Sequence, residues 1–138
     1  KKLGADHVVN YRTQDFVEEV RRWTGKRGVD VAIEHIGGET LERTIYCLSR
    51  LGTLVTIGSH ATHWGRVDLR HVYSKNLRIL GTNLGTILAL RPIVDQMAQG
   101  RLKATVDRVF PLTEARAAVQ YLLDRKNQGK LVLVPAGA

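Results

Sequence analysis

The sequence has little of several features on which particular classes of protein depend. It contains one cysteine, Cys47, which excludes an internal disulfide and a zinc cluster built on several cysteines. No apolar run approaches the roughly 20 residues that span a bilayer. No basic, apolar and small-residue succession typical of a signal peptide opens the chain. We therefore expect a cytoplasmic protein with no membrane partner.

The positive charge is large but dispersed. A formal net charge of +8 is compatible with a nucleic-acid partner. The basic residues come in short groups near expected helix C-termini, where cations complement the helix dipole: Arg21-Arg22, Lys26-Arg27, Arg101 with Lys103, and Arg125-Lys126. Aromatic residues make up only 6%, and no basic stripe with interleaved aromatics is present, so a soluble surface is favoured over nucleic-acid binding.

Short apolar strands alternate with amphipathic helical patterns along the chain. We expect strands at residues 7–11, 29–36, 53–57, 77–82, 105–112 and 130–134. Five helices are expected between them: one capped by Thr13 with Asp15 in its first turn, one bearing Leu41, Ile45 and Leu48 and stopped by Gly52, a short one at 68–74, one with Pro92 in its first turn, and one capped by Thr113.

This alternation predicts an α/β fold with a parallel sheet. After Gly100 a strand–helix–strand segment replaces the regular units. We therefore expect a domain boundary near Lys103, with one domain at residues 1–103 and a separate C-terminal segment at residues 104–138.

Several motifs follow one another in a characteristic order. They include Leu3-Gly4-Ala5-Asp6-His7-Val8-Val9-Asn10-Tyr11, Gly28-Val29-Asp30-Val31-Ala32-Ile33-Glu34-His35-Ile36-Gly37-Gly38, Leu51-Gly52-Thr53-Leu54-Val55-Thr56-Ile57-Gly58, Asn76-Leu77-Arg78-Ile79-Leu80-Gly81-Thr82 and Gln128-Gly129-Lys130-Leu131-Val132-Leu133-Val134-Pro135. No single motif is specific, but the ordered set resembles the C-terminal portion of the medium-chain dehydrogenase/reductase superfamily, which includes zinc-type alcohol dehydrogenases and quinone oxidoreductases.

The resemblance implies a function for a complete protein. Residues 1–103 would be Rossmann strands three to six, and residues from 104 on would return to the catalytic domain. The cofactor would be NAD or NADP, and hydride would pass between it and a small-molecule alcohol, aldehyde, quinone or enone. Zinc takes part in some members, but the zinc ligands and the Gly-rich phosphate loop lie upstream in such proteins. We therefore assign no catalytic residue and no metal ligand, and we expect the isolated chain to be inactive.

Cofactor-binding residues are expected where parallel strands end, because ligands of open α/β sheets bind at the carboxyl ends of the strands. In members of the superfamily the matching loops line the nicotinamide and its ribose. These positions are His35, Ile36, Gly37, Ile57, Gly58, Ser59, Asn83, Leu84 and Gly85. The alternative is ordinary loop chemistry, and for Gly37-Gly38 a tight turn into a helix is favoured over a phosphate loop.

Further candidates have two interpretations each. Asn10 and Tyr11 would lie near the adenine edge, or simply form a strand-to-helix turn. By the resemblance to quinone reductases Arg125, with Lys130 nearby, would reach the cofactor phosphates; otherwise it completes the last helical turn. His60 and His63 share a loop, where solvated side chains are favoured over a metal site.

The resemblance places Rossmann strands one and two outside this sequence, and without them part of the parallel sheet would lack neighbouring strands. We expect the strand at 7–11 to pair directly with the strand at 29–36 in a four-stranded sheet, and one apolar sheet face to lie bare. The strand Leu77 to Leu84 is an apolar edge that only Arg78 guards, so we expect a homodimer through it. The alternative function is a non-catalytic nucleotide- or RNA-binding remnant.

Overall fold

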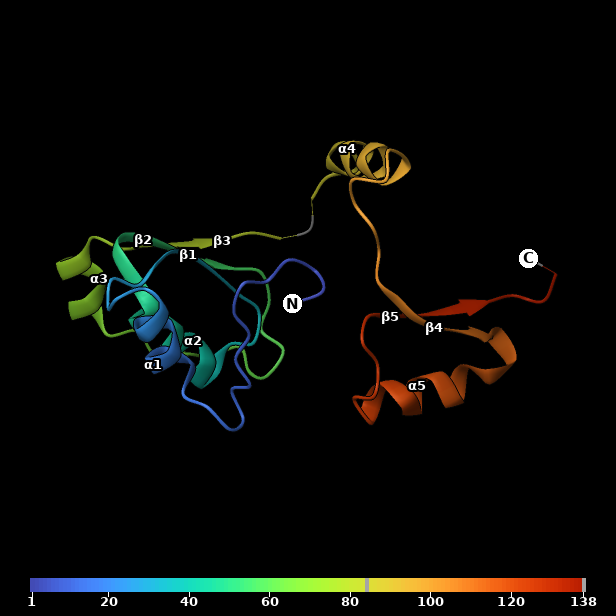
Figure 1. The fold of residues 1–138 in the computed structure, drawn as a ribbon, viewed down its shortest axis with the longest axis horizontal. Helices are drawn as coiled ribbons and strands as arrows, with labels where there is room; N and C mark the ends of the chain where they lie inside the picture. The colour runs from blue at the N-terminus through green and yellow to red at the C-terminus, as the bar shows by residue number, and fades with distance from the viewer. Residues whose placement is uncertain (84, 138) are drawn as a thin grey trace. The chain divides into compact units, whose positions relative to one another are not determined.

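Three parallel strands in the order β1-β2-β3 form the larger of two sheets in this protein. The computed structural model describes residues 1–83 and 85–137, in two compact units, Lys1–Leu84 and Gly85–Ala138 (Figure 1). The first unit contains α1 (Phe16–Trp23), β1 (Val29–Glu34), α2 (Gly38–Cys47), β2 (Leu48–Thr56), α3 (Leu69–Lys75) and β3 (Arg78–Gly81). The alternation confirms the predicted α/β class with a parallel sheet.

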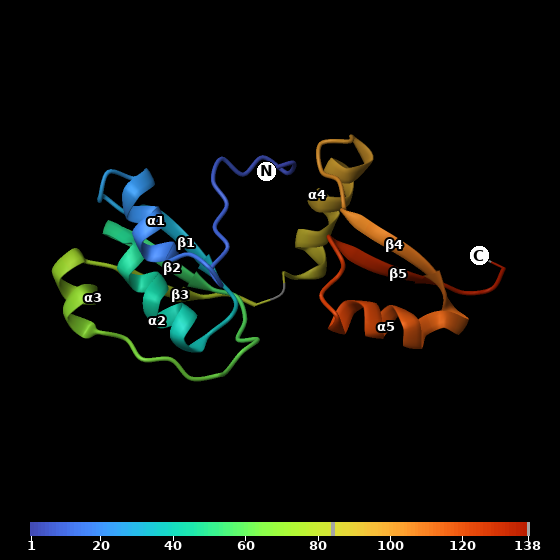
Figure 2. The same ribbon diagram turned by 60° about the horizontal axis from the view of Figure 1, so that its bottom comes forward.

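One face of this sheet carries the core. Ala32, Leu54 and Ile79 are aligned across the three strands and therefore share a face. Leu54 is fully buried and packs with Ile45 of α2, Leu48 and Leu77. In both ribbon views α1, α2 and α3 lie on one side of the sheet (Figures 1 and 2). The crossover helices thus bury the Leu54 face.

The other face is bare within the first unit. Ile33, Val55 and Leu80 are aligned across the strands, and Ile33 and Leu80 are 69% and 51% exposed. Val31, next on the same face of β1, is 58% exposed. This confirms the expected uncovered apolar face, because all three helices of the unit lie on the opposite side.

The expected strand at residues 7–11 is wrong. His7 to Asn10 have no regular structure, and Tyr11 lies in a turn. The anticipated pairing with β1 does not form, so the sheet has three strands rather than four. Asn10 instead closes a turn, in which its carbonyl accepts from the backbone N–H of Thr13 and Gln14. A strand without a paired neighbour leaves its backbone groups to water or to local turns.

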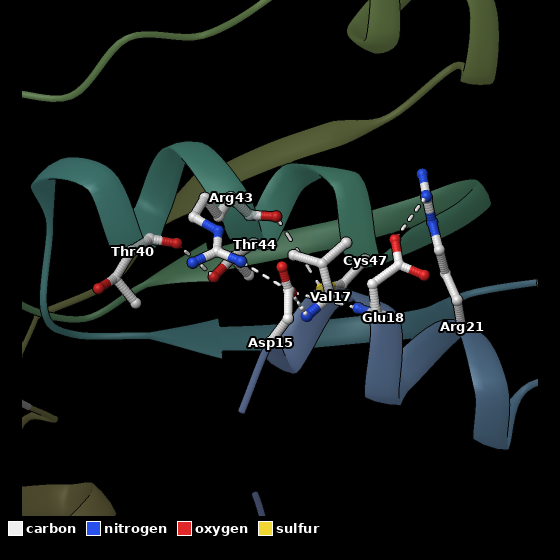
Figure 3. A network of polar contacts seen from close by, with 8 residues as sticks. All are labelled: Asp15, Val17, Glu18, Arg21, Thr40, Arg43, Thr44 and Cys47. Atoms are coloured by element: carbon white, nitrogen blue, oxygen red, sulfur yellow. Dashed lines mark hydrogen bonds and ion pairs between the residues drawn. The ribbon is translucent and has the colours of Figure 1, made fainter. Parts of the chain in front are cut away.

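Asp15, not Thr13, caps α1. The Asp15 carboxylate accepts from the backbone N–H of Val17 at 2.9 Å and of Glu18 at 3.3 Å. It also forms an ion pair with Arg43 of α2 at 2.7 Å, so one side chain starts α1 and joins it to α2 (Figure 3). The expectation of Thr13 was wrong because the chain is still turning at that residue.

The boundary between α2 and β2 also differs from expectation. The helix ends at Cys47, and β2 begins at Leu48 instead of at Thr53. Leu51 has a positive φ of 63°, and the pairing register between β1 and β2 shifts between Val29 and Val31. An irregularity of this kind lets β2 begin early, because its extra residues bulge out of the register while the pairing of β1 with β2 continues from Val31 onward.

The second unit contains α4 (Ile87–Ala98), β4 (Val106–Pro111), a 3-10 turn at Leu112–Glu114, α5 (Ala115–Leu123) and β5 (Lys130–Val134). The strands β4 and β5 pair in parallel, and α5 connects them. Phe110 and Ala118 are buried between these elements. The strand–helix–strand expectation is confirmed, while the division of a complete protein at residues 103 and 104 stays a prediction.

Two details of this unit were wrongly expected. Pro92 lies inside α4 rather than in its first turn, because Ile87-Leu88-Ala89-Leu90 extend the helix towards its amino end. A proline there removes only one helical N–H bond, the one to the carbonyl of Leu88. Thr113 does not cap α5, because the 3-10 turn runs directly into that helix.

Candidate functional site

The carboxyl ends of β1, β2 and β3 lie at one edge of the sheet, as expected for parallel strands. The backbone N–H of Ile57 donates to the Glu34 carbonyl at 2.9 Å, and that of Thr82 donates to the Thr56 carbonyl at 3.0 Å. The sheet therefore continues to its last residues. The loops that begin at His35, Ile57 and Asn83 all leave from this edge.

The first two of these loops are joined to each other. The N–H of His60 donates to the His35 carbonyl at 3.1 Å, and the N–H of Ala61 donates to the Ile36 carbonyl at 2.7 Å. The rings of His35 and His60 meet edge to face at 5.4 Å. The structure thus brings the predicted residues of the β1 and β2 ends together.

The loop after β2 leaves no room for a side chain at Gly37. It has a φ of +80°, and a Cβ placed on it would lie 2.3 Å from the carbonyl oxygen of Thr62. Gly37 also starts α2, so the favoured interpretation of a tight turn into a helix is confirmed. By contrast, a Cβ on Gly58 would meet only ordinary contacts, the nearest at 3.5 Å from the His35 carbonyl oxygen. The role of Gly58 beside a cofactor stays a prediction.

Glu34 holds the end of β1 and was missed by the sequence reasoning. Its side-chain Oε1 accepts from the N–H of Ile36 at 2.6 Å and of Gly37 at 2.8 Å. The residue is 3% exposed, and Oε2 has no hydrogen-bond partner among the described residues. A signal was present, because Glu34 is an acidic residue at the end of β1 that shares a face with Ala32. Glu34 therefore sets the path of the first loop.

A small pocket opens beside the end of β1. It has a volume of about 210 Å³ and is lined by Val9, Tyr11, Phe16, Ile36 and Thr40. Two predicted site residues, Tyr11 and Ile36, meet there, although 25 positions separate them in the sequence. Asn10 does not line the pocket; its side chain accepts from the N–H of Arg12 at 3.1 Å. Asn10 thus closes the turn before α1 and Tyr11 lines the pocket, while the contacts of both with a cofactor stay predictions.

The wall of this pocket is held by the contact between α1 and α2. The guanidinium carbon of Arg43 lies 4.9 Å from the centre of the Phe16 ring. The same guanidinium pairs with Asp15, and the Thr44 hydroxyl donates to the Thr40 carbonyl at 2.7 Å (Figure 3). The Arg43 guanidinium therefore positions Phe16, and the Thr44 hydroxyl contacts the backbone of Thr40.

The size and lining of the pocket limit what it can hold. Sites for whole small-molecule ligands span about 300–1,000 Å³, so this pocket suits one planar ring rather than a complete dinucleotide. Its lining is mostly apolar and aromatic, with hydroxyl groups on Tyr11 and Thr40. Apolar walls with a few polar groups suit an adenine ring, so the described residues fit part of a nicotinamide cofactor.

The remaining predicted residues lie elsewhere along the chain. Ser59 lies with its Oγ 3.1 Å from Nδ1 of His63. Asn83 lies two residues after the end of β3, Leu84 lies outside the described residues, and Gly85 begins the second unit. Arg125 follows α5 with a φ of 53°, and the N–H of Lys130 donates to the Thr105 carbonyl at 2.8 Å. Their contacts with a cofactor stay predictions.

The described part of the chain contains no group of three or more histidine, cysteine, aspartate or glutamate side chains placed to hold a metal ion. None of the helices in residues 1–83 and 85–137 is both long and apolar enough to cross a membrane.

Comparison with known proteins identifies the family. A family model described as zinc-binding dehydrogenase matches residues 3–133. The chain is 35% identical to a 2-haloacrylate reductase from Burkholderia sp, over 98% of this chain and 44% of that protein. It is 30% identical to quinone oxidoreductase 1 of Escherichia coli (strain K12), over 97% of this chain and 44% of that protein.

Solved structures agree with these relatives. The crystal structure of AibC superposes with a TM-score of 0.86 at 34% identity, over 97% of this chain and 37% of that one. The chain thus spans less than half the length of the relatives it matches. With a match along nearly its whole length, the chain belongs to the zinc-binding dehydrogenases, within the medium-chain dehydrogenase/reductase superfamily.

Proposed function

We propose that this chain is the C-terminal portion of an NAD(P)-dependent oxidoreductase. The reaction would transfer hydride between the nicotinamide ring and a small alcohol, aldehyde, quinone or enone. The observation that carries the proposal is the pocket of Tyr11, Ile36 and Thr40 at the carboxyl edge of a parallel sheet, in a chain of this family. The cofactor supplies the hydride chemistry when it is bound.

The described residues would bind and orient the cofactor. Tyr11, Ile36 and Thr40 would hold one ring, the adenine by the resemblance, in the pocket beside β1. The loops after β1 and β2 would present backbone groups to the ribose and nicotinamide. Any zinc ligands and the proton donor would come from outside these 138 residues, so we infer that the chain alone does not turn over substrate.

Assembly and location belong to the same proposal. The outer edge of β3 would pair with a second copy, because among the described residues β3 pairs only with β2. The protein would act in the cytoplasm, and its partners would be a small-molecule substrate and a second copy rather than nucleic acid.

Cofactor binding tests the proposal. We expect the chain to bind NADH or NADPH saturably in a fluorescence titration, and Tyr11→Ala to weaken that binding about tenfold, as expected for the loss of a stacking ring. Tyr73→Ala is the matched control, because Tyr73 is exposed on α3, outside the pocket. Absence of saturable binding to both cofactors, or equal weakening by both variants, would contradict the proposed site.

A further inference from the structure

A basic cleft lies at the amino ends of the strands of the first unit's sheet, where β1 and β2 begin. It has a volume of about 700 Å³. Five cationic side chains line it, from α1, from the turn before β1 and from α3: Arg21, Arg22, Lys26, Arg27 and Lys75. The proposed dehydrogenase function makes no use of this edge, because its cofactor binds at the carboxyl ends of the strands.

The cations outnumber their carboxylate partners. Three of them form local ion pairs three residues apart along the chain: Arg21–Glu18, Arg22–Glu19 and Arg27–Asp30. Five cations against three carboxylates leave a net charge of +2 at the cleft. The arginine side chains of these pairs are between 44% and 68% exposed. Exposed ion pairs of this kind are weak, so an anionic ligand can exchange for the carboxylates.

Lys26 is the least engaged of the five. Its ammonium group has no hydrogen bond or ion pair among residues 1–83 and 85–137. Its backbone has a φ of 68° and its N–H donates to the Arg21 carbonyl, which ends α1. Glycine or asparagine is the usual residue in this left-handed conformation. A lysine here accepts that backbone cost and places an uncompensated charge at the cleft.

Lys75 is held in place from the other side. Its Nζ donates to the Leu48 carbonyl at 2.8 Å, at the start of β2. Tyr46 and His71 also line the cleft, and their rings meet edge to face at 4.5 Å. The cations of α1 and α3 therefore face a shared cleft with an aromatic wall, and they do not form a stripe along the surface.

We propose that this cleft binds a small polyanion that carries two or more phosphoryl groups. Guanidinium groups present paired donors that match phosphoryl oxygens, and lysine adds a point charge. The volume lies within the range of small-molecule sites. Nucleic-acid binding would instead use an extended basic surface along the backbone, so a compact ligand is favoured.

Titration with inorganic tripolyphosphate tests the proposal. We expect one-to-one binding to the 138-residue chain in isothermal calorimetry at 50 mM salt, weakening as salt screens the charges. Lys26→Gly removes the ammonium group, and glycine suits the left-handed backbone, so the variant should keep its fold. Its affinity for tripolyphosphate should fall about tenfold, because one charge-assisted contact is lost. Arg116→Gln, exposed on α5 and outside the cleft, is the control and should bind as the parent does.

Other outcomes separate this cleft from its alternatives. If adenosine triphosphate binds as tightly as tripolyphosphate, the cleft recognises the phosphoryl chain alone. If adenosine triphosphate binds more tightly, its base also contacts the Tyr46–His71 wall. Tyr11→Ala should leave tripolyphosphate binding unchanged, which separates this site from the proposed cofactor pocket. Three results would overturn the proposal. They are the absence of saturable binding, binding that persists in denaturing urea, and tighter binding to a single-stranded RNA oligonucleotide that releases many counterions.

Discussion

The Asp15 carboxylate and the Arg43 guanidinium lie 2.7 Å apart and connect the first turn of α1 to the middle of α2 (Figure 3). Asp15 also accepts two backbone N–H bonds from its own helix. The bond to the Glu18 N–H is the largest cause that holds the pKa of Asp15 below its ordinary value of 3.8, and Arg43 contributes to the same shift. Through Arg43 and Phe16 this contact reaches the candidate cofactor pocket.

We therefore expect a pH-dependent contribution of Asp15 to stability. Since the pKa is lowered in the folded state, this contribution is present above pH 3.8 and is lost as the pH falls through the folded-state pKa. Asp15→Asn keeps an oxygen that can cap α1 but removes the charge. Its urea midpoint should lie below that of the parent at pH 7, and the difference should shrink towards pH 3.

The control for this prediction is Asp6→Asn, because Asp6 is exposed in the amino-terminal segment and makes no ion pair among the described residues. Its urea midpoint should follow that of the parent at every pH. A parallel loss in both variants would show that Asp15 acts only through the net charge of the protein.

Gly28 is expected to tolerate no side chain. A Cβ at this position would lie 2.6 Å from the Cys47 carbonyl oxygen, and φ is +88°. Gly28→Ala should lower the free energy of unfolding by more than about 3 kcal/mol, since backbone atoms must move. Gly25→Ala is the matched comparison, because φ is +57° with open space around it; it should cost only about 1–2 kcal/mol. Equal losses in urea denaturation would contradict the close packing of Gly28.

The two faces of the first sheet should respond differently to truncation. Leu54 is fully buried among Ile45, Leu48 and Leu77, so Leu54→Ala should cost about 2–5 kcal/mol. Val31 lies on the bare face at 58% exposure, and Val31→Ala should change stability by no more than about 0.5 kcal/mol. A large loss for Val31→Ala in the isolated chain would show that this face is covered, for example by a second copy.

Cys47 should react slowly with thiol reagents. It is 3% exposed, and burial raises the pKa of its thiol to about 11. At pH 8 only about one thiol in a thousand is then ionised, and the thiolate is the reactive form. Labelling with a disulfide reagent at pH 8 should be at least about 100-fold slower in the folded chain than in denaturing urea. Equal rates would place Cys47 at the surface.

The proposed homodimer is tested at Ile79. The Thr82 N–H donates to β2, and backbone groups alternate along a strand, so the Ile79 N–H points away from β2. Ile79→Pro removes that outward donor and leaves the pairing with β2 in place. Sedimentation should show a dimer for the parent and a monomer for the variant, and Leu88→Pro in α4 controls for the effect of proline elsewhere. A dimer that survives Ile79→Pro would refute pairing through β3.

Several elements could be predicted because their signals are local. The strand β5 is apolar and bounded by Gly129 and Pro135, and its expected and observed limits coincide. The short helix α3 begins after Asp68, a residue type that caps helices. The strand at residues 7–11 was wrong because a strand depends on a neighbour, and β-type residues without a partner do not pair.

The candidate site shows the same division. The sequence placed His35, Ile57 and Asn83 at strand ends, which follows from alternation and the strand-end rule. It did not show that Tyr11 and Ile36 share a pocket, that Glu34 holds the intervening turn, or that Arg21 and Lys75 face one cleft. The pocket and the cleft join residues far apart in the chain, and their distances follow from how α1, α2 and α3 pack. The Glu34 contacts are local, but they depend on the burial of that side chain.

The α/β class, the family resemblance and the charge follow from the amino-acid sequence alone, because each depends on local pattern and composition. Three features came only with the tertiary structure: Asp15 begins α1, Lys26 joins a cleft, and the sheet has three strands rather than four. The physical reason is that hydrogen bonds, ion pairs and burial between distant segments depend on packing, which no local pattern specifies.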